Sequence, residues 1–152
     1  MINKISVMNV ARLDHFTLRT ARLEDTKNFF VIMAGLRVGP RPPFLFPGYW
    51  LYKDDVALLR LAAPSGDEAL EQYLGGRSNV PFGSGAVDHI AFRCTGLSTF
   101  MQLLRYHKVA HRLRTVPELG EHQVFVTDPN SVIIEFIFPD IESLVALTGD
   151  IS

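Results

Sequence analysis

One short motif occurs twice in the chain, and this repeat limits the possible folds more than any other feature. Residues 13–20 read LDHFTLRT and residues 87–94 read VDHIAFRC, with Asp, His and Arg in the same places. The apolar positions also match in kind, and the offset from His15 to His89 is 74 residues. Such self-similarity indicates that one supersecondary unit is present in two copies.

Each copy begins with residues that alternate between apolar and polar, which is the period of a half-buried strand. A helix is expected next in both copies, and Gly35 is expected to form the C-terminal cap of the first. Three more strands are expected after each helix. We therefore predict an α+β fold in which two βαβββ modules make a single domain over residues 1–152. The modules are expected at 11–63 and 86–139, joined by a linker at 64–85.

Residue by residue, the pattern predicts element bounds that a structure can test. In the first module we expect strands near 13–19, 36–39, 48–53 and 55–62 and a helix over 23–34. In the second module we expect strands near 87–93, 111–115, 122–127 and 131–138 and a helix over 97–107.

Composition excludes several classes of protein. With 47% hydrophobic and 20% charged residues, the chain has the composition of a folded globular protein. A net charge of -1 gives no global positive field for binding nucleic acid or an anionic membrane. The single cysteine, Cys94, cannot form an internal disulfide. We expect a cytoplasmic protein with no nucleic-acid or membrane partner.

Two of the five histidines stand out because the repeat gives them equivalent positions. His15 and His89 lie on the polar faces of the two opening strands, so an approximate two-fold axis would bring them to one cavity. Glu135 is the one charged residue in the apolar run VIIEFIF, and a buried carboxylate needs a partner. That partner is either Arg60 or Arg93 in an ion pair, or a divalent metal. Two imidazoles and one carboxylate leave coordination positions open, as catalytic sites require.

These features together resemble the vicinal oxygen chelate superfamily, which includes glyoxalase I, bleomycin-binding proteins and extradiol dioxygenases. The resemblance rests on the paired modules, the Asp-His at the head of each, and Asp128-Pro129 seven residues before Glu135. It covers about residues 11–139. It implies a glyoxalase-like, cup-shaped mixed sheet, a homodimer, and one divalent metal ion such as Fe, Mn, Zn, Ni or Co. The ligand positions of the family fall on His15, His89 and Glu135.

The fourth ligand position of the family falls on Arg60, which has no lone pair to give to a metal. Two interpretations follow. A three-ligand metal enzyme would act on a small substrate with neighbouring oxygens, as an isomerase, lyase, thiol transferase or dioxygenase, with Arg60 binding an anionic substrate. Alternatively, Arg60 pairs with Glu135 in place of the metal and leaves a metal-free binding protein of the bleomycin-resistance type.

Four further residues are candidates for the site. His122 heads the strand before Glu135 and is a possible catalytic proton carrier, or an exposed strand-end histidine. Trp50 and Tyr52 can form an apolar wall against a substrate, or pack an interface. Arg93 shares the polar face of His89 and can bind a substrate carboxylate, or only solubilise the strand end.

Overall fold

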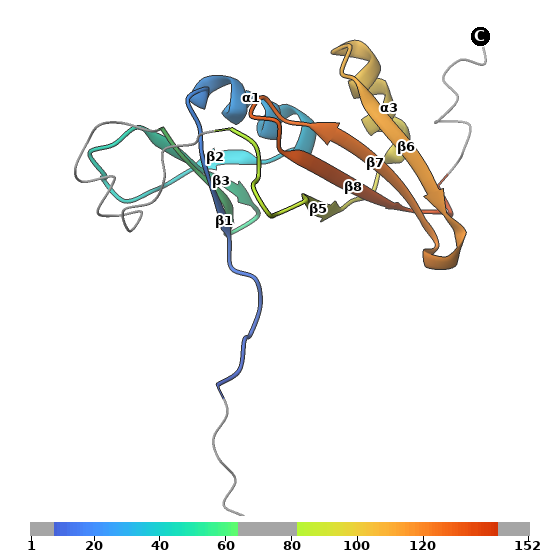
Figure 1. Ribbon diagram of the computed structural model, residues 1–152, viewed down its shortest axis with the longest axis horizontal. Coiled ribbons are helices and arrows are strands. Elements are labelled where there is room, and N and C mark those ends of the chain that lie inside the picture. The colour runs from blue at the N-terminus through green and yellow to red at the C-terminus, as the bar shows by residue number, and fades with distance from the viewer. Residues whose placement is uncertain (1–7, 64–81, 143–152) are drawn as a thin grey trace, which may run out of the picture.

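The computed structural model describes residues 8–63 and 82–142, which form two similar modules (Figure 1). The first module contains β1 (Phe16–Arg19), α1 (Leu23–Ala34), β2 (Arg37–Gly39), β3 (Gly48–Lys53) and β4 (Val56–Ala62). The second contains β5 (His89–Arg93), α3 (Leu97–Tyr106), β6 (His111–Val116), a 3-10 turn (Pro117–Leu119), β7 (Glu121–Thr127) and β8 (Ile133–Pro139). The two predicted βαβββ modules are confirmed.

Each module forms a mixed four-stranded sheet, and the strand order is the same in both. The orders are β1-β4-β3-β2 and β5-β8-β7-β6. The first strand of each module runs parallel to the last, whereas the other neighbours are antiparallel. The opening strands start later than the alternation suggests, because pairing with the last strand begins only at Phe16 and at His89. Residues 64–81 of the expected linker lie outside the described residues.

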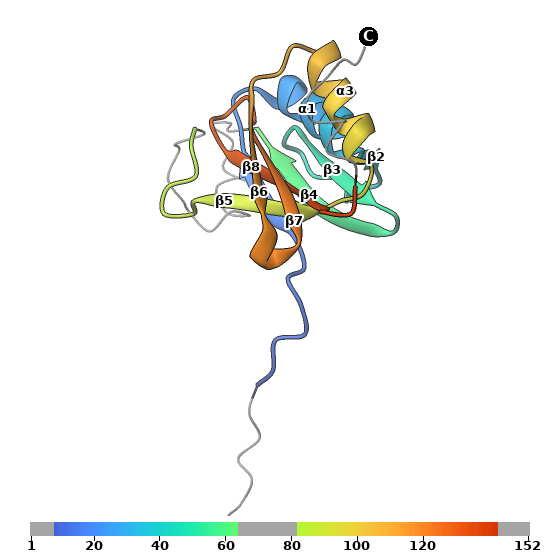
Figure 2. The same cartoon turned by 90° about the vertical axis from the view of Figure 1, so that its right-hand side faces the viewer.

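The two helices lie on the same side of the sheets and cover the apolar faces (Figure 2). Their buried residues follow the helical spacing of an amphipathic helix: Thr26, Phe30 and Met33 on α1, and Leu97, Phe100, Met101 and Leu104 on α3. A single apolar cluster includes residues of both modules, and a contact between the rings of Phe16 and Phe92, 6.4 Å apart, links β1 to β5. No helix within the described ranges is long and apolar enough to span a membrane. Neither of the two described helices lies on the other face of the sheets.

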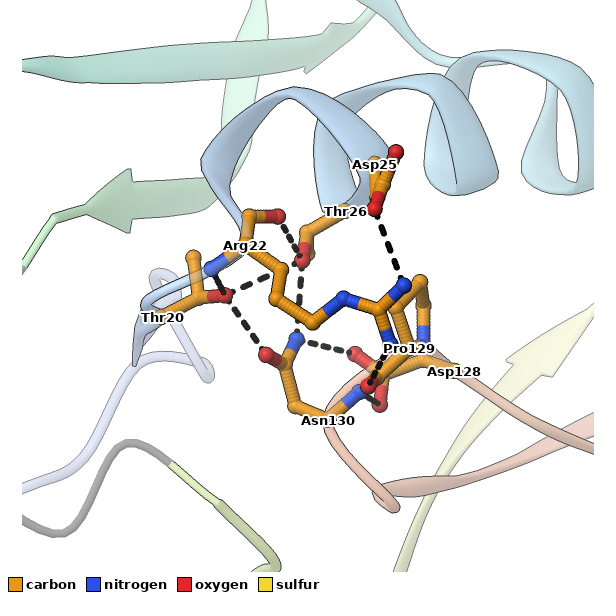
Figure 3. A network of polar contacts seen from close by, with 7 residues as sticks. All are labelled: Thr20, Arg22, Asp25, Thr26, Asp128, Pro129 and Asn130. Carbon is orange, nitrogen blue, oxygen red and sulfur yellow. Dashed lines mark hydrogen bonds and ion pairs between the residues drawn. The ribbon is translucent and has the colours of Figure 1, made fainter.

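A buried polar network joins the two modules at the start of α1 (Figure 3). The Thr20 hydroxyl donates a hydrogen bond to the Asn130 side-chain oxygen, and the Asn130 amide donates to the Thr26 hydroxyl at 2.9 Å. The same amide donates to Asp128 at 3.0 Å. Thr20, Thr26, Asp128 and Asn130 are all buried. Because each side chain has its partners, the network fixes the first module against the second without leaving an unsatisfied group.

Replacing Asn130 with alanine is expected to lower the free energy of unfolding by about 2–4 kcal/mol, because two buried hydroxyls and a carboxylate lose a partner at once. Denaturant unfolding at unchanged m-value measures this loss. The matched control is Asp25→Ala, which breaks an exposed ion pair with Arg22 of 3.0 Å in the same region. That control is expected to cost less than about 1 kcal/mol. Equal losses in both variants would contradict the structural role given to Asn130.

Candidate functional site

In both modules, the aspartate of the repeated motif holds the histidine that follows it. The Nδ1 atom of His15 lies 2.6 Å from the Asp14 carboxylate, and Nδ1 of His89 lies 2.7 Å from that of Asp88. A carboxylate bound to one ring nitrogen fixes the orientation of the imidazole and leaves the other nitrogen for a ligand. Nε2 is therefore the nitrogen of each ring that faces away from its aspartate. The sequence shows both aspartates but gives no role to them.

Glu135 has His89 as its partner. The His89 Nε2 atom lies 2.9 Å from the Glu135 carboxylate, which is 5% exposed. β5 pairs with β8 in parallel, and Ala91 stands opposite Glu135. His89 is two residues before Ala91, so its side chain projects from the same face as Glu135. The hydrogen bond to Asp88 raises the pKa of His89, and the negative charges of Glu135 and Asp88 raise it further. Burial acts in the opposite direction and lowers it. The buried carboxylate thus meets an imidazole, not the arginine of the ion-pair alternative.

His15 does not join this pair within one chain. Among residues 8–63 and 82–142, no three His, Cys, Asp or Glu side chains lie close enough together to hold a metal ion. His15 precedes β1 of the first sheet, whereas His89 and Glu135 belong to the second. The single chain therefore presents two halves of the predicted three-ligand set, and the expected convergence of both histidines on one cavity is not seen in it.

Arg60 lies in the first sheet and stacks on a tryptophan. Its guanidinium carbon is 3.9 Å from the centre of the Trp50 ring, and the two residues are partners on neighbouring strands. The ion pair that the structure gives it is a long one, 4.0 Å to Asp14. The short contact with Glu135 that the metal-free interpretation predicts is not among the ion pairs of the described residues. Trp50 and Arg60 are thus brought together, away from Glu135.

Arg93 is already engaged by a row of polar side chains on the second sheet. It lies 2.9 Å from Glu121, which also accepts a hydrogen bond from the Gln123 amide at 3.0 Å. Arg114 in turn donates to Gln123 at 2.8 Å. Hydrogen bonds from Gln123 and Arg93 lower the pKa of Glu121. The sequence does not reveal this row, although the alternation of β7 puts 121, 123 and 125 on one face.

His122 lies on the other face of that strand. It is 1% exposed among the apolar residues under the helices, opposite Phe138 in register, and its Nδ1 atom lies 3.0 Å from the Thr115 hydroxyl. Glu135 stands opposite Phe125, on the face without helices. The structure therefore does not place His122 beside Glu135 and corrects the expectation of an exposed strand-end histidine.

Tyr52 serves the local structure of the first sheet. Its hydroxyl donates a hydrogen bond to the Pro40 carbonyl. Its ring lies so close to Gly39 that a Cβ atom there would come within 2.5 Å of it. The ring is therefore packed on β2 and is not presented as an open wall for a substrate.

A shallow hollow adjoins the His89–Glu135 pair. The Phe125 ring lies edge-on to His89 at 6.2 Å and borders a hollow of about 300 Å³. Its other lining residues are Ala110, His111, Arg112, Thr127 and Ile133. A larger cavity of about 590 Å³ opens between the modules on the helix side, where Cys94 and Phe100 line it, but none of the candidate metal ligands does. Burial raises the pKa of the Cys94 thiol and so favours its unreactive protonated form.

Comparison with known proteins identifies the fold. No protein-family model and no curated protein matches the sequence. Among solved structures, a glyoxylase/bleomycin resistance protein/dioxygenase domain from Frankia sp. EAN1pec is similar with a TM-score of 0.61 and 12% identity, over 91% of this chain and 97% of that one. A lactoylglutathione lyase from Agrobacterium tumefaciens matches with a TM-score of 0.57 and 14% identity, over 90% and 99%.

An antibiotic binding protein from Streptomyces sp. CB03234 matches with a TM-score of 0.58 and 14% identity, over 88% of this chain and 99% of that one. One architecture therefore serves an enzyme and a binding protein, and the likeness identifies the fold without choosing between them. The chain therefore has the fold of these glyoxalase, bleomycin resistance and dioxygenase proteins.

Proposed function

We propose that the protein is a metal-dependent enzyme that acts on a small organic molecule with neighbouring oxygen atoms. His15, His89 and Glu135 would hold one divalent ion, chosen from Fe, Mn, Zn, Ni and Co. The observation that supports this proposal most directly is that each histidine is oriented through Nδ1 by its own aspartate. Two nitrogens and one carboxylate oxygen suit such an ion and leave positions open for substrate. When bound, the metal would act as a Lewis acid on the substrate oxygens.

The residues of the chain supply binding and proton handling around that centre. A proton on His89 Nε2 in the contact with Glu135 would have to leave before that nitrogen could ligate a metal. Glu135 would also carry a proton to or from the substrate. The Phe125 ring lies edge-on to His89 and gives one side of the pair an apolar neighbour. The reaction type, whether isomerase, lyase, thiol transferase or dioxygenase, depends on which substrate the hollow admits.

A homodimer would bring the two halves of the ligand set together. Residues 8–14 extend away from the body of the chain (Figure 1), and they carry three apolar side chains that are 79–80% exposed. Those side chains are Met8, Val10 and Leu13. Exposed apolar surface of this kind is buried when a partner binds. Since His15 follows directly on this arm, docking of the arm on a second copy would carry His15 towards the partner's second sheet.

A second function is supported by two specific observations. The same fold occurs in an antibiotic binding protein, and Glu135 already has a partner in His89 without a metal. In this alternative the protein binds a small aromatic molecule and does not transform it. Trp50 would supply the apolar contact, and Arg60 the charge.

Thermal unfolding in the presence of each candidate metal distinguishes the two functions. A ligand that binds only the folded state stabilises it by about 2.7 kcal/mol at a concentration one hundred times its Kd. We expect one or more of the five metals to raise the Tm of the wild type and of His107→Ala, a surface control, but not of His89→Ala. A rise in all three proteins would indicate adventitious binding. No rise in any of them would favour the binding protein.

A further inference from the structure

The Arg60 guanidinium presents hydrogen-bond donors that nothing in the described chain uses. Stacking on Trp50 at 3.9 Å occupies the face of the guanidinium and leaves its in-plane N–H groups for other partners. The side chain is 22% exposed, and within residues 8–63 and 82–142 it donates no hydrogen bond. Asp14, at 4.0 Å, is 64% exposed and already bound to His15. The charge of Arg60 is therefore poorly compensated.

A second arginine, Arg41, reaches the same sheet from the loop before β3. Its Nη2 atom donates to the carbonyls of Phe44 and Phe46, and its guanidinium lies over both rings, 5.7 and 5.3 Å from their centres. Its Nη1 atom is buried and has no hydrogen-bond partner. A Cβ atom on Gly48 would come within 2.4 Å of this nitrogen, so the glycine makes room for the guanidinium against β3. In the described chain, Arg41 has no acidic partner.

The strand register places the two arginines on the same face of the first sheet. Trp50 pairs with Arg60, and Gly48, which touches Arg41, pairs with Ala62. Ala62 packs under Phe46 and is two residues from Arg60, so it projects from the same face at a distance of about 7 Å along the strand. Arg41 Nη1 and Arg60 Nε are both buried without a hydrogen-bond partner, and burying a donor unpaired is costly. An oxyanion bound by both arginines would pair these donors.

We propose that Arg41 and Arg60 bind the oxyanion group of a small organic acid, a carboxylate or a phosphate, whose apolar part lies against Trp50. Guanidinium groups bind both kinds of oxyanion through paired, charge-assisted hydrogen bonds. Binding of the acid does not depend on the proposed enzyme function; only its identification as the substrate does. It adds Arg41 to the binding residues and restricts the substrate to anions.

Trp50 is the only tryptophan of the chain, so its fluorescence reports on this patch alone. The titration uses benzoate, phenyl phosphate and neutral benzamide as probes, on the Glu135→Gln variant so that no metal is required. We expect a saturable change with at least one of the two anions, and binding of benzamide weaker by about tenfold or more. Calorimetry of the same titrations provides a second readout.

The arginine variants test the assignment of the patch. Arg60→Gln and Arg41→Gln are each expected to weaken binding of the anion by about tenfold or more. Arg37→Gln is the matched control, because Arg37 also lies over an aromatic ring of the same sheet, at 5.2 Å from Tyr52, but donates to the Asp54 carbonyl. It is expected to change affinity less than about twofold. Arg41→Lys keeps the charge of the loop and is expected to fall between the wild type and Arg41→Gln.

Equal binding of benzamide and benzoate, or equal losses in Arg37→Gln and Arg60→Gln, would overturn the proposal. No saturable change with either anion would overturn it as well. These outcomes are independent of the metal, since the titration is carried out without the Glu135 carboxylate. Failure of metal binding in the wild type would leave the anion result intact, and the reverse also holds.

Discussion

Replacing Glu135 with glutamine is expected to remove the bound metal almost completely. The amide keeps the size of the side chain but loses the negative charge, and its oxygen is a much weaker ligand. Loss of a group that only orients a ligand costs about 10–100-fold in metal affinity, so loss of a ligand should cost at least about 100-fold. After reconstitution, the metal content should fall from about one ion per chain to near zero, which elemental analysis measures directly.

Glu121→Gln is the matched control for this experiment. Glu121 is another buried carboxylate on the same face of the second sheet, but its partners are Arg93 and Gln123. We expect this variant to retain its metal. Equal metal content in wild type, Glu121→Gln and Glu135→Gln would exclude Glu135 as a ligand. Near-zero content in all three, even after reconstitution, would leave the metal-free binding protein as the better interpretation.

The fold could be predicted from the sequence because its determinants are local and occur twice. Alternation around His15 and His89 identifies the opening strands, and the spacing of Phe30 and Met33 identifies one face of a helix. Gly35 has a φ of 65° at the end of that helix, where a residue without Cβ is favoured. Each of these signals lies within a short stretch of consecutive residues. A repeat then requires both modules to have the same topology.

The site could be predicted only in part, because its contacts depend on strand register. Whether His122 or Gln123 shares a face with Glu135 is decided by the pairing of Phe125 with Glu135. A shift of one residue would reverse the answer. The alternation therefore shows that His122 and Gln123 lie on opposite faces, but not which face is covered by helices. The same limit applies to Arg60, whose stacking on Trp50 follows from the register of β3 with β4.

Neither the periodicity of the sequence nor its repeat predicts the contacts between the modules. Asn130 bonds to Thr20 across 110 residues of sequence, and no periodicity relates the two positions. The repeat suggests that the modules are related by symmetry, but it does not predict the distance between His15 and His89. For this reason both the three-ligand set of His15, His89 and Glu135 and its assembly stay predictions.

That assembly can be tested by mixing two variants that each lack one histidine. If His15 of one chain joins His89 and Glu135 of its partner, neither His15→Ala nor His89→Ala alone has an intact site. In a mixed dimer, however, one of the two sites takes His15 and His89 from the chains that retain them, as two-fold symmetry requires. Refolding the variants together at equal concentration should therefore restore about a quarter of the wild-type metal content.

A site contained in one chain gives a different result. Every chain in the mixture would then still lack one ligand, and the metal content would stay near that of the separate variants. The control is a mixture of His89→Ala with Glu135→Gln, both of which damage the same sheet. Because the two lost ligands come from the same half of the site, each site in their mixed dimer lacks one of them, so no restoration is expected. Restoration in this control as well would show that the ligands are not divided between chains as proposed, since only ligands from different halves of a shared site can complement each other.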